Sequence, residues 1–150
     1  MLKALNTIFL SLMMPSIAIA SGSEIKTIAE TYSAWQSGEK DLHRNLDTLK
    51  AVASNSSSPD TEKALTNLEQ SVESLEKSFK KFNDLPSLET ANLALEKINN
   101  LCTSFNLMNK NQPIGIEAIM SSTEIGWLVR YMQERTSNLP KHNHCVVGEA

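Results

Sequence analysis

Two cysteines are the residues whose type and number most directly imply chemistry. Cys102 and Cys145 are the two cysteines of the 150-residue chain. The first 20 residues have the pattern of an export signal, and an exported protein meets oxidising conditions. Two thiols have one intramolecular pairing, so we expect a Cys102–Cys145 disulfide. Closing a loop of 44 residues, from 102 to 145, stabilises a chain by about 4 kcal/mol in the chain-entropy model. The alternatives are a reduced cysteine in the core at position 102 and an intermolecular bridge through Cys145.

The sequence His142-Asn143-His144-Cys145 is the second group with possible chemistry. Two imidazoles and a thiolate are ligands that zinc and copper accept. A disulfide at Cys145 would remove the sulfur, and the neighbouring residues offer no fourth ligand. We therefore expect a solvated polar tail, with a metal site on His142 and His144 as the alternative.

Residues for catalysis or for a cofactor are not evident. The serines are not part of a G-x-S-x-G motif, and no phosphate-binding glycine pattern occurs. Glu117 and Glu124 lie in an apolar region, where we interpret them as helix-turn or cap residues. Haem ligands are missing, because residues 21–36 lack methionine, residues 122–138 lack histidine, and no Cys-x-x-Cys-His occurs. We predict no enzyme and no cofactor.

A possible binding surface lies on the last predicted helix. Trp127, Tyr131 and Arg135 recur at i, i+4 and i+8 on one side, and the opposite side is also apolar. Trp, Tyr and Arg are the residue types that most often anchor interfaces. Either these residues bind a partner, or the helix is central in the bundle and buries both sides. We take Trp127, Tyr131 and Arg135 as the candidate binding residues.

The elements that position these residues are predicted to be helices, most clearly in an antiparallel hairpin over residues 59–108. Ser58 and Ser87 are suitable N-caps, and Pro59 is tolerated at the first helical position. Each half carries one apolar seam with spacing 3-4-3-4-3, as in coiled coils. The seam residues are Leu65, Leu68, Val72, Leu75, Phe79 and Phe82, then Leu88, Ala91, Leu95, Ile98, Cys102 and Phe105.

Segments on both sides of the hairpin complete a small bundle. Residues 21–36 predict a short helix with a Ser21/Glu24 capping box and Gly38 as its stop, and residues 39–54 predict a second helix. Residues 114–120 are apolar but short, and a Ser121/Glu124 capping box predicts that the last helix begins there. The sequence thus predicts an all-α bundle of four to five helices with one disulfide.

The first 20 residues have the pattern of a secretory signal peptide. Lys3 gives a positive start, an apolar run covers residues 8–14, and Ala18-Ile19-Ala20 matches a cleavage site. The apolar run is too short for a membrane span. We expect a signal peptide at 1–20, a helical domain at 21–150, a periplasmic or secreted location, and no membrane span after cleavage.

The charge pattern narrows the class of partner. The formal net charge is −3, and the longest basic run is Lys80-Lys81. Nucleic-acid binding requires a clustered positive face, so we exclude it.

By fold-level analogy, we predict a binding protein of inhibitor or immunity type that acts on an exported protein. A periplasmic chaperone or stress protein and a metal-binding protein using His142 and His144 are the alternatives. Homo-oligomers stay possible, because narrow seams can also pair between chains.

Overall fold

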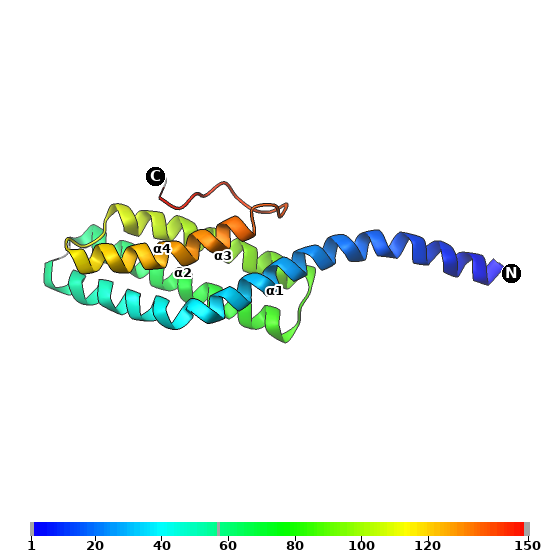
Figure 1. The fold of residues 1–150 in the computed structure, drawn as a ribbon, viewed down its shortest axis with the longest axis horizontal. Coiled ribbons are helices and arrows are strands. Elements are labelled where there is room, and N and C mark those ends of the chain that lie inside the picture. Colours follow the sequence, from blue (N-terminus) through cyan, green and yellow to red (C-terminus); the bar gives the residue numbers. More distant parts are fainter. Residues whose placement is uncertain (1, 57, 149–150) are drawn as a thin grey trace.

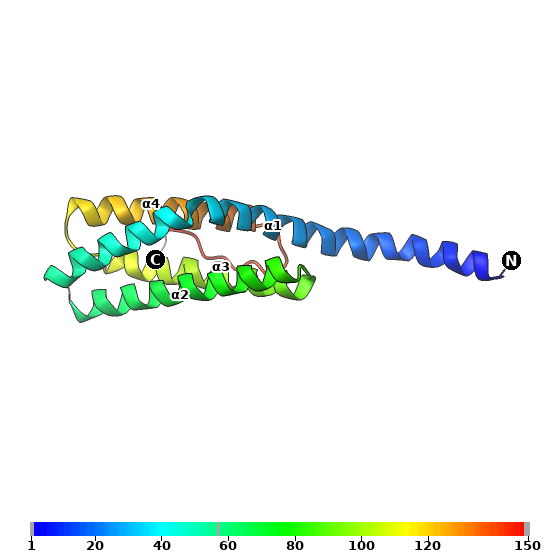
Figure 2. The same ribbon diagram turned by 90° about the horizontal axis from the view of Figure 1, so that it is seen from below.

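The structure is a computed structural model that describes residues 2–56 and 58–148, with side chains for residues 22–55 and 58–148. Four helices form this part of the chain: α1 (Leu2–Ser56), α2 (Pro59–Asp84), α3 (Leu88–Lys110) and α4 (Ile116–Arg135). They pack as a bundle in which α2 lies against α3 and α1 against α4 (Figures 1 and 2). The all-α prediction is confirmed, and the described residues contain four helices.

The predicted hairpin is confirmed, together with its caps. The Ser58 hydroxyl accepts a hydrogen bond from the Thr61 backbone N–H at 3.3 Å, and Pro59 is the first residue of α2. Ser87 and Thr90 form a reciprocal capping box at the start of α3. All six predicted seam residues of α2 are buried. The caps and the narrow seam therefore fix both the ends and the rotation of α2.

The seam of α3 is broader than predicted. Leu88 is 40% exposed, so its assignment to the seam was wrong, because it opens the helix beside the α2–α3 turn. Ala94, Leu101 and Met108 are buried in addition to the predicted residues. This extra burial follows from the position of α3, which contacts α1 and α4 as well as α2.

Gly38 does not end a helix, so the two predicted N-terminal helices are wrong. α1 runs without interruption past Gly38, because Trp35 and Leu42 on either side remain buried on the same face. A Cβ atom at Gly38 would lie 3.1 Å from Leu128 Cδ2, so α1 and the Leu128 side chain of α4 are close together at this position. The N-terminal part of α1 projects beyond the bundle (Figure 1). The side chains of the predicted signal peptide and of Ser21 lie outside the described residues.

The start of α4 also differs from the prediction. α4 begins at Ile116 after Gly115, whose φ of 135° favours glycine. Ser121 is therefore inside the helix and buried, and the Ser121/Glu124 capping box was wrong. The neighbouring Ser122 donates a hydrogen bond to Gln112 Oε1 at 2.8 Å. Packing against the α3–α4 turn thus outweighs the local capping signal.

The C-terminal tail is attached to the bundle by a disulfide and by side-chain amides. Cys102 and Cys145 are bonded, with 6.2 Å between their Cα atoms, as predicted. Asn99, Asn106 and Gln133 donate hydrogen bonds to the backbone carbonyls of Lys141, Val146 and Cys145, respectively. The tail therefore lies along α3 and α4 (Figure 2), and its side chains stay largely solvated, since Lys141, Asn143, His144 and Val146 are exposed. Among the described residues, no helix has the length and apolar character to cross a membrane.

Candidate functional site

The outer side of α4 exposes the aromatic residues that the sequence singled out. Trp127 is 65% exposed and Tyr131 is 45% exposed, whereas Ile125 and Val129 on the inner side are buried. The interpretation in which α4 buries both of its apolar sides is therefore wrong. Arg135 forms an ion pair with Glu30 of α1, so this residue also links the end of α4 to α1.

Further exposed apolar residues continue this surface toward the start of α4. Ile116 is 74% exposed and Met120 is 60% exposed, and Ile119 is exposed beside them. At 100° per residue, they share one side of the helix with the two aromatic residues. We call this surface the α4 apolar stripe, which consists of Ile116, Ile119, Met120, Trp127 and Tyr131. A stripe of this width normally faces a core, and here it faces solvent.

Sequence reasoning missed the first half of the stripe. The last helix was expected to begin at Ser121. Ile116 and Met120 therefore lay in a separate turn, with no fixed orientation toward Trp127. The signal was nevertheless present, since positions 116, 120, 127 and 131 are separated by four, seven and four residues. These separations bring residues to the same helix side once the helix is continuous.

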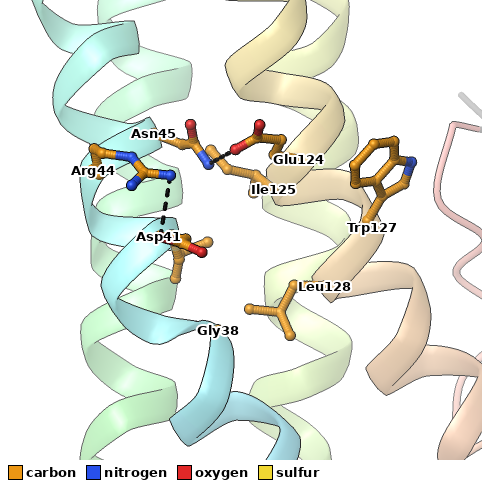
Figure 3. A pocket seen from close by; sticks show the side chains of 9 residues that line it. Gly38, Asp41, Arg44, Asn45, Glu124, Ile125, Trp127 and Leu128 are labelled. Carbon is orange, nitrogen blue, oxygen red and sulfur yellow. Dashed lines mark hydrogen bonds and ion pairs between the residues drawn. The ribbon is translucent and has the colours of Figure 1, made fainter.

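A groove between α1 and α4 runs beside the stripe (Figure 3). It has a volume of about 400 Å³ and is lined by the buried Leu42 and Ile125, with Gly38 and Leu128 at one end. A second hollow of about 210 Å³ shares part of its lining and extends to Glu117 and Met120. Trp127 also lines this groove, and its ring points away from α1 (Figure 3). The α4 apolar stripe and the more polar groove are therefore adjacent along α4.

Two polar contacts shape the α1 side of this groove. The buried Asn45 amide donates a hydrogen bond to Glu124 Oε2 at 2.7 Å and so joins α1 to α4 (Figure 3). Arg44 forms an ion pair with Asp41 at 3.1 Å on α1 itself. Glu124 is thus an interhelical hydrogen-bond acceptor, and its interpretation as a helix-turn or cap residue was wrong.

The lining of the two hollows has an excess of negative charge. Its ionisable residues are three carboxylates and one guanidinium, namely Asp41, Glu117, Glu124 and Arg44. Arg44 is offset by its partner Asp41, so Glu117 and Glu124 determine the sign of the local field. The groove therefore favours cationic groups.

The two histidines of the tail differ in environment, because His142 is half-buried and His144 is exposed. His142 Nδ1 is buried without a hydrogen-bond partner, and Cys145 is held in the disulfide. Burial, and secondly the charge of His144, lower the pKa of His142, so its imidazole is neutral at pH 7. Within residues 2–56 and 58–148, no three His, Cys, Asp or Glu side chains gather as a metal site.

Comparison with known proteins gives no further information about the site. No protein-family model, no curated protein and no solved structure matches this chain.

Proposed function

We propose that the protein is a secreted or periplasmic binding protein that recognises a protein partner through the α4 apolar stripe. The carrying observation is the 65% exposure of Trp127 on a helix whose other side is packed in the core. A single exposed apolar residue needs no explanation, but several large exposed apolar residues on one side of a helix indicate an interaction site. Tryptophan and tyrosine contribute large contact areas and are frequent binding hot spots.

The rigidity of the bundle supports this role. The inner side of α4 is held by buried Ile125, Val129 and Met132, and Glu124 and Arg135 join the helix to α1. A partner therefore meets a surface that is already ordered, which lowers the entropic cost of binding. Inhibitor or immunity-type action on an exported partner suits such a surface by fold-level analogy.

The proposed compartment has two supports. Residues 1–20 have the signal-peptide pattern, and Cys102 and Cys145 form a disulfide. Mass spectrometry of the protein from its native host tests this proposal. We expect a mature chain that begins near Ser21 and contains no free thiol, and an intact leader in the cytosol would contradict it.

Site-specific photo-crosslinking in the native host tests the binding function. A photoreactive phenylalanine analogue at position 127 should give a discrete adduct with the partner. The same analogue in place of Glu73, an exposed residue of α2, is the matched control. We expect the adduct at position 127 only, and its loss in a Met120→Ala background. Equal labelling at both positions, or none at position 127, would contradict the proposal.

A chaperone or stress protein is the second candidate. The exposed Met120 favours it, because the flexible methionine side chain adapts to different clients. The two functions differ in selectivity. A chaperone should suppress the aggregation of several unrelated unfolded proteins, whereas a specific binder should give one adduct and suppress none.

A further inference from the structure

We infer that the partner presents a cationic amphipathic helix, which lies along α4 with its apolar side on the α4 apolar stripe and its basic side chains on Glu117 and Glu124. This inference rests on the proposed function and specifies the partner's chemistry. Binding of an amphipathic helix to an exposed apolar surface is a common mode of peptide recognition.

The dimensions of the stripe fit one helix of the partner. Ile116 and Tyr131 mark its ends and are 15 residues apart, which corresponds to roughly 22 Å along α4. A partner helix of about four turns covers this length. Met120 lies between the isoleucines at one end of the stripe and the two aromatic residues at the other. Its unbranched side chain adjusts to the partner's apolar residues.

The carboxylates of Glu117 and Glu124 specify the charge of the partner. Glu117 and Glu124 are seven residues apart on the α1-facing side of the stripe, about 10 Å along the axis. Basic residues at i and i+7 of a partner helix have the same separation. Glu124 accepts one hydrogen bond from Asn45, and a carboxylate has capacity for more.

The other charges around the stripe leave this preference in place. Arg44 is paired with Asp41 on the α1 side, and Arg135 is paired with Glu30 of α1. Arg130 and Glu134 line the opposite edge, beside the tail, and carry opposite charges. A second copy of this chain would bring another Glu117 and Glu124 to the same surface, and an anionic lipid would add further negative charge. Like charges at close range are unfavourable, so both are poorer occupants than a cationic helix.

Two synthetic peptides test the chemistry directly. One is an 18-residue amphipathic helix of leucine and lysine, and the other has glutamate at every lysine position. Binding to the disulfide-bonded chain is followed by tryptophan fluorescence. Trp127 reports because it is exposed, whereas Trp35 is buried, and Trp127→Phe identifies the source of the change. We expect a blue shift with the Leu/Lys peptide, none with the Leu/Glu peptide, and weaker binding at high salt.

Charge-neutralising variants locate the contact. Glu117→Gln/Glu124→Gln keeps an acceptor for Asn45 and should weaken Leu/Lys binding by about three- to tenfold. Glu73→Gln/Glu89→Gln removes the same charge from exposed positions on α2 and α3 and should leave binding unchanged. Thermal unfolding of both variants checks that they fold.

Several results would overturn the inference. They are equal binding of both peptides, equal weakening by the two double variants, no Trp127 response, or self-association through Trp127 in sedimentation measurements. The crosslinking experiment is independent of peptide charge. A crosslink at position 127 combined with a failed peptide test would keep the proposed function and reject the cationic helix.

Discussion

The α2–α3 hairpin and the α1–α4 pair are built from helices of similar type but expose different surfaces. The outer face of α2 is polar from Thr66 to Lys81, and its large apolar residues are buried. α4 instead exposes Ile116, Met120 and Trp127 beside a groove. α2 meets its packing and capping requirements within the chain, whereas α4 has apolar area that another molecule can cover.

This difference separates stability from recognition. An α2 core residue contributes through burial and cavity energetics, while an exposed residue of α4 contributes little to folding and can contribute much to binding. The disulfide strengthens the side of the bundle that carries the tail, because it joins the tail to α3. Four sets of variants or conditions probe this division, in order of decreasing effect.

Removing the disulfide should have the largest effect. We expect Cys102→Ala/Cys145→Ala to lower the free energy of unfolding by about 4 kcal/mol, because the unfolded chain regains the entropy of a closed loop. Urea denaturation of the oxidised native chain and the variant measures this change. A loss below about 1 kcal/mol would show that the hydrogen bonds from Asn99, Asn106 and Gln133 hold the tail by themselves.

A core leucine and the exposed tryptophan test the comparison directly. Leu75 of α2 is fully buried, so Leu75→Ala should cost about 3 kcal/mol of unfolding free energy. Trp127→Ala should cost less than about 0.5 kcal/mol, because the side chain is mostly exposed. The same variant should weaken partner or Leu/Lys peptide binding by about 2 kcal/mol. A large loss of stability in Trp127→Ala would contradict the assignment of this residue to recognition.

The hairpin could be predicted because its signals are local and agree with each other. Ser58, Pro59 and Ser87 mark the helix ends, and the 3-4 spacing of α2 identifies its buried face. Gly38 and the Ser121/Glu124 pair misled the prediction because tertiary contacts decide those positions. Trp35 and Leu42 keep α1 continuous on the core, and the preference of a single residue costs only about 1 kcal/mol.

The candidate site was predicted in part. Trp127 and Tyr131 were found from residue type and spacing, but their exposure depends on which other helices pack around α4, and this is not a local property. Ile116 and Met120 were missed because the helix start was placed too late. The Asn45–Glu124 bond joins residues 79 positions apart, and neither residue has a distinctive sequence context.

Two glycines in the α1–α4 half distinguish tight from adjustable packing. A Cβ atom at Gly126 would lie 2.9 Å from Cζ of the buried Phe105 ring. We expect Gly126→Ala to destabilise the protein by about 1 kcal/mol, since overpacking exceeds the gain in helix propensity. Gly38→Ala meets only the end of the half-buried Leu128 side chain and should stabilise by about 0.5 kcal/mol. Thermal unfolding measures both, and equal destabilisation would contradict this distinction.

The smallest expected effect is a pH dependence of the tail. The pKa of His142 is lowered in the folded protein, chiefly by burial, from its ordinary value of 6.5. As the pH falls below 6.5, the unfolded chain therefore binds a proton that the folded chain resists, and stability decreases until the pH passes the folded pKa. We expect the difference in Tm between pH 7.5 and pH 5.5 to be smaller in His142→Asn than in the native protein.

His144→Asn is the matched control and should retain most of the difference, because the charge of His144 is the secondary cause of the shift. An unchanged difference in His142→Asn would show that the tail stays in place when this imidazole is protonated, and that carboxylates elsewhere in the bundle set the pH dependence.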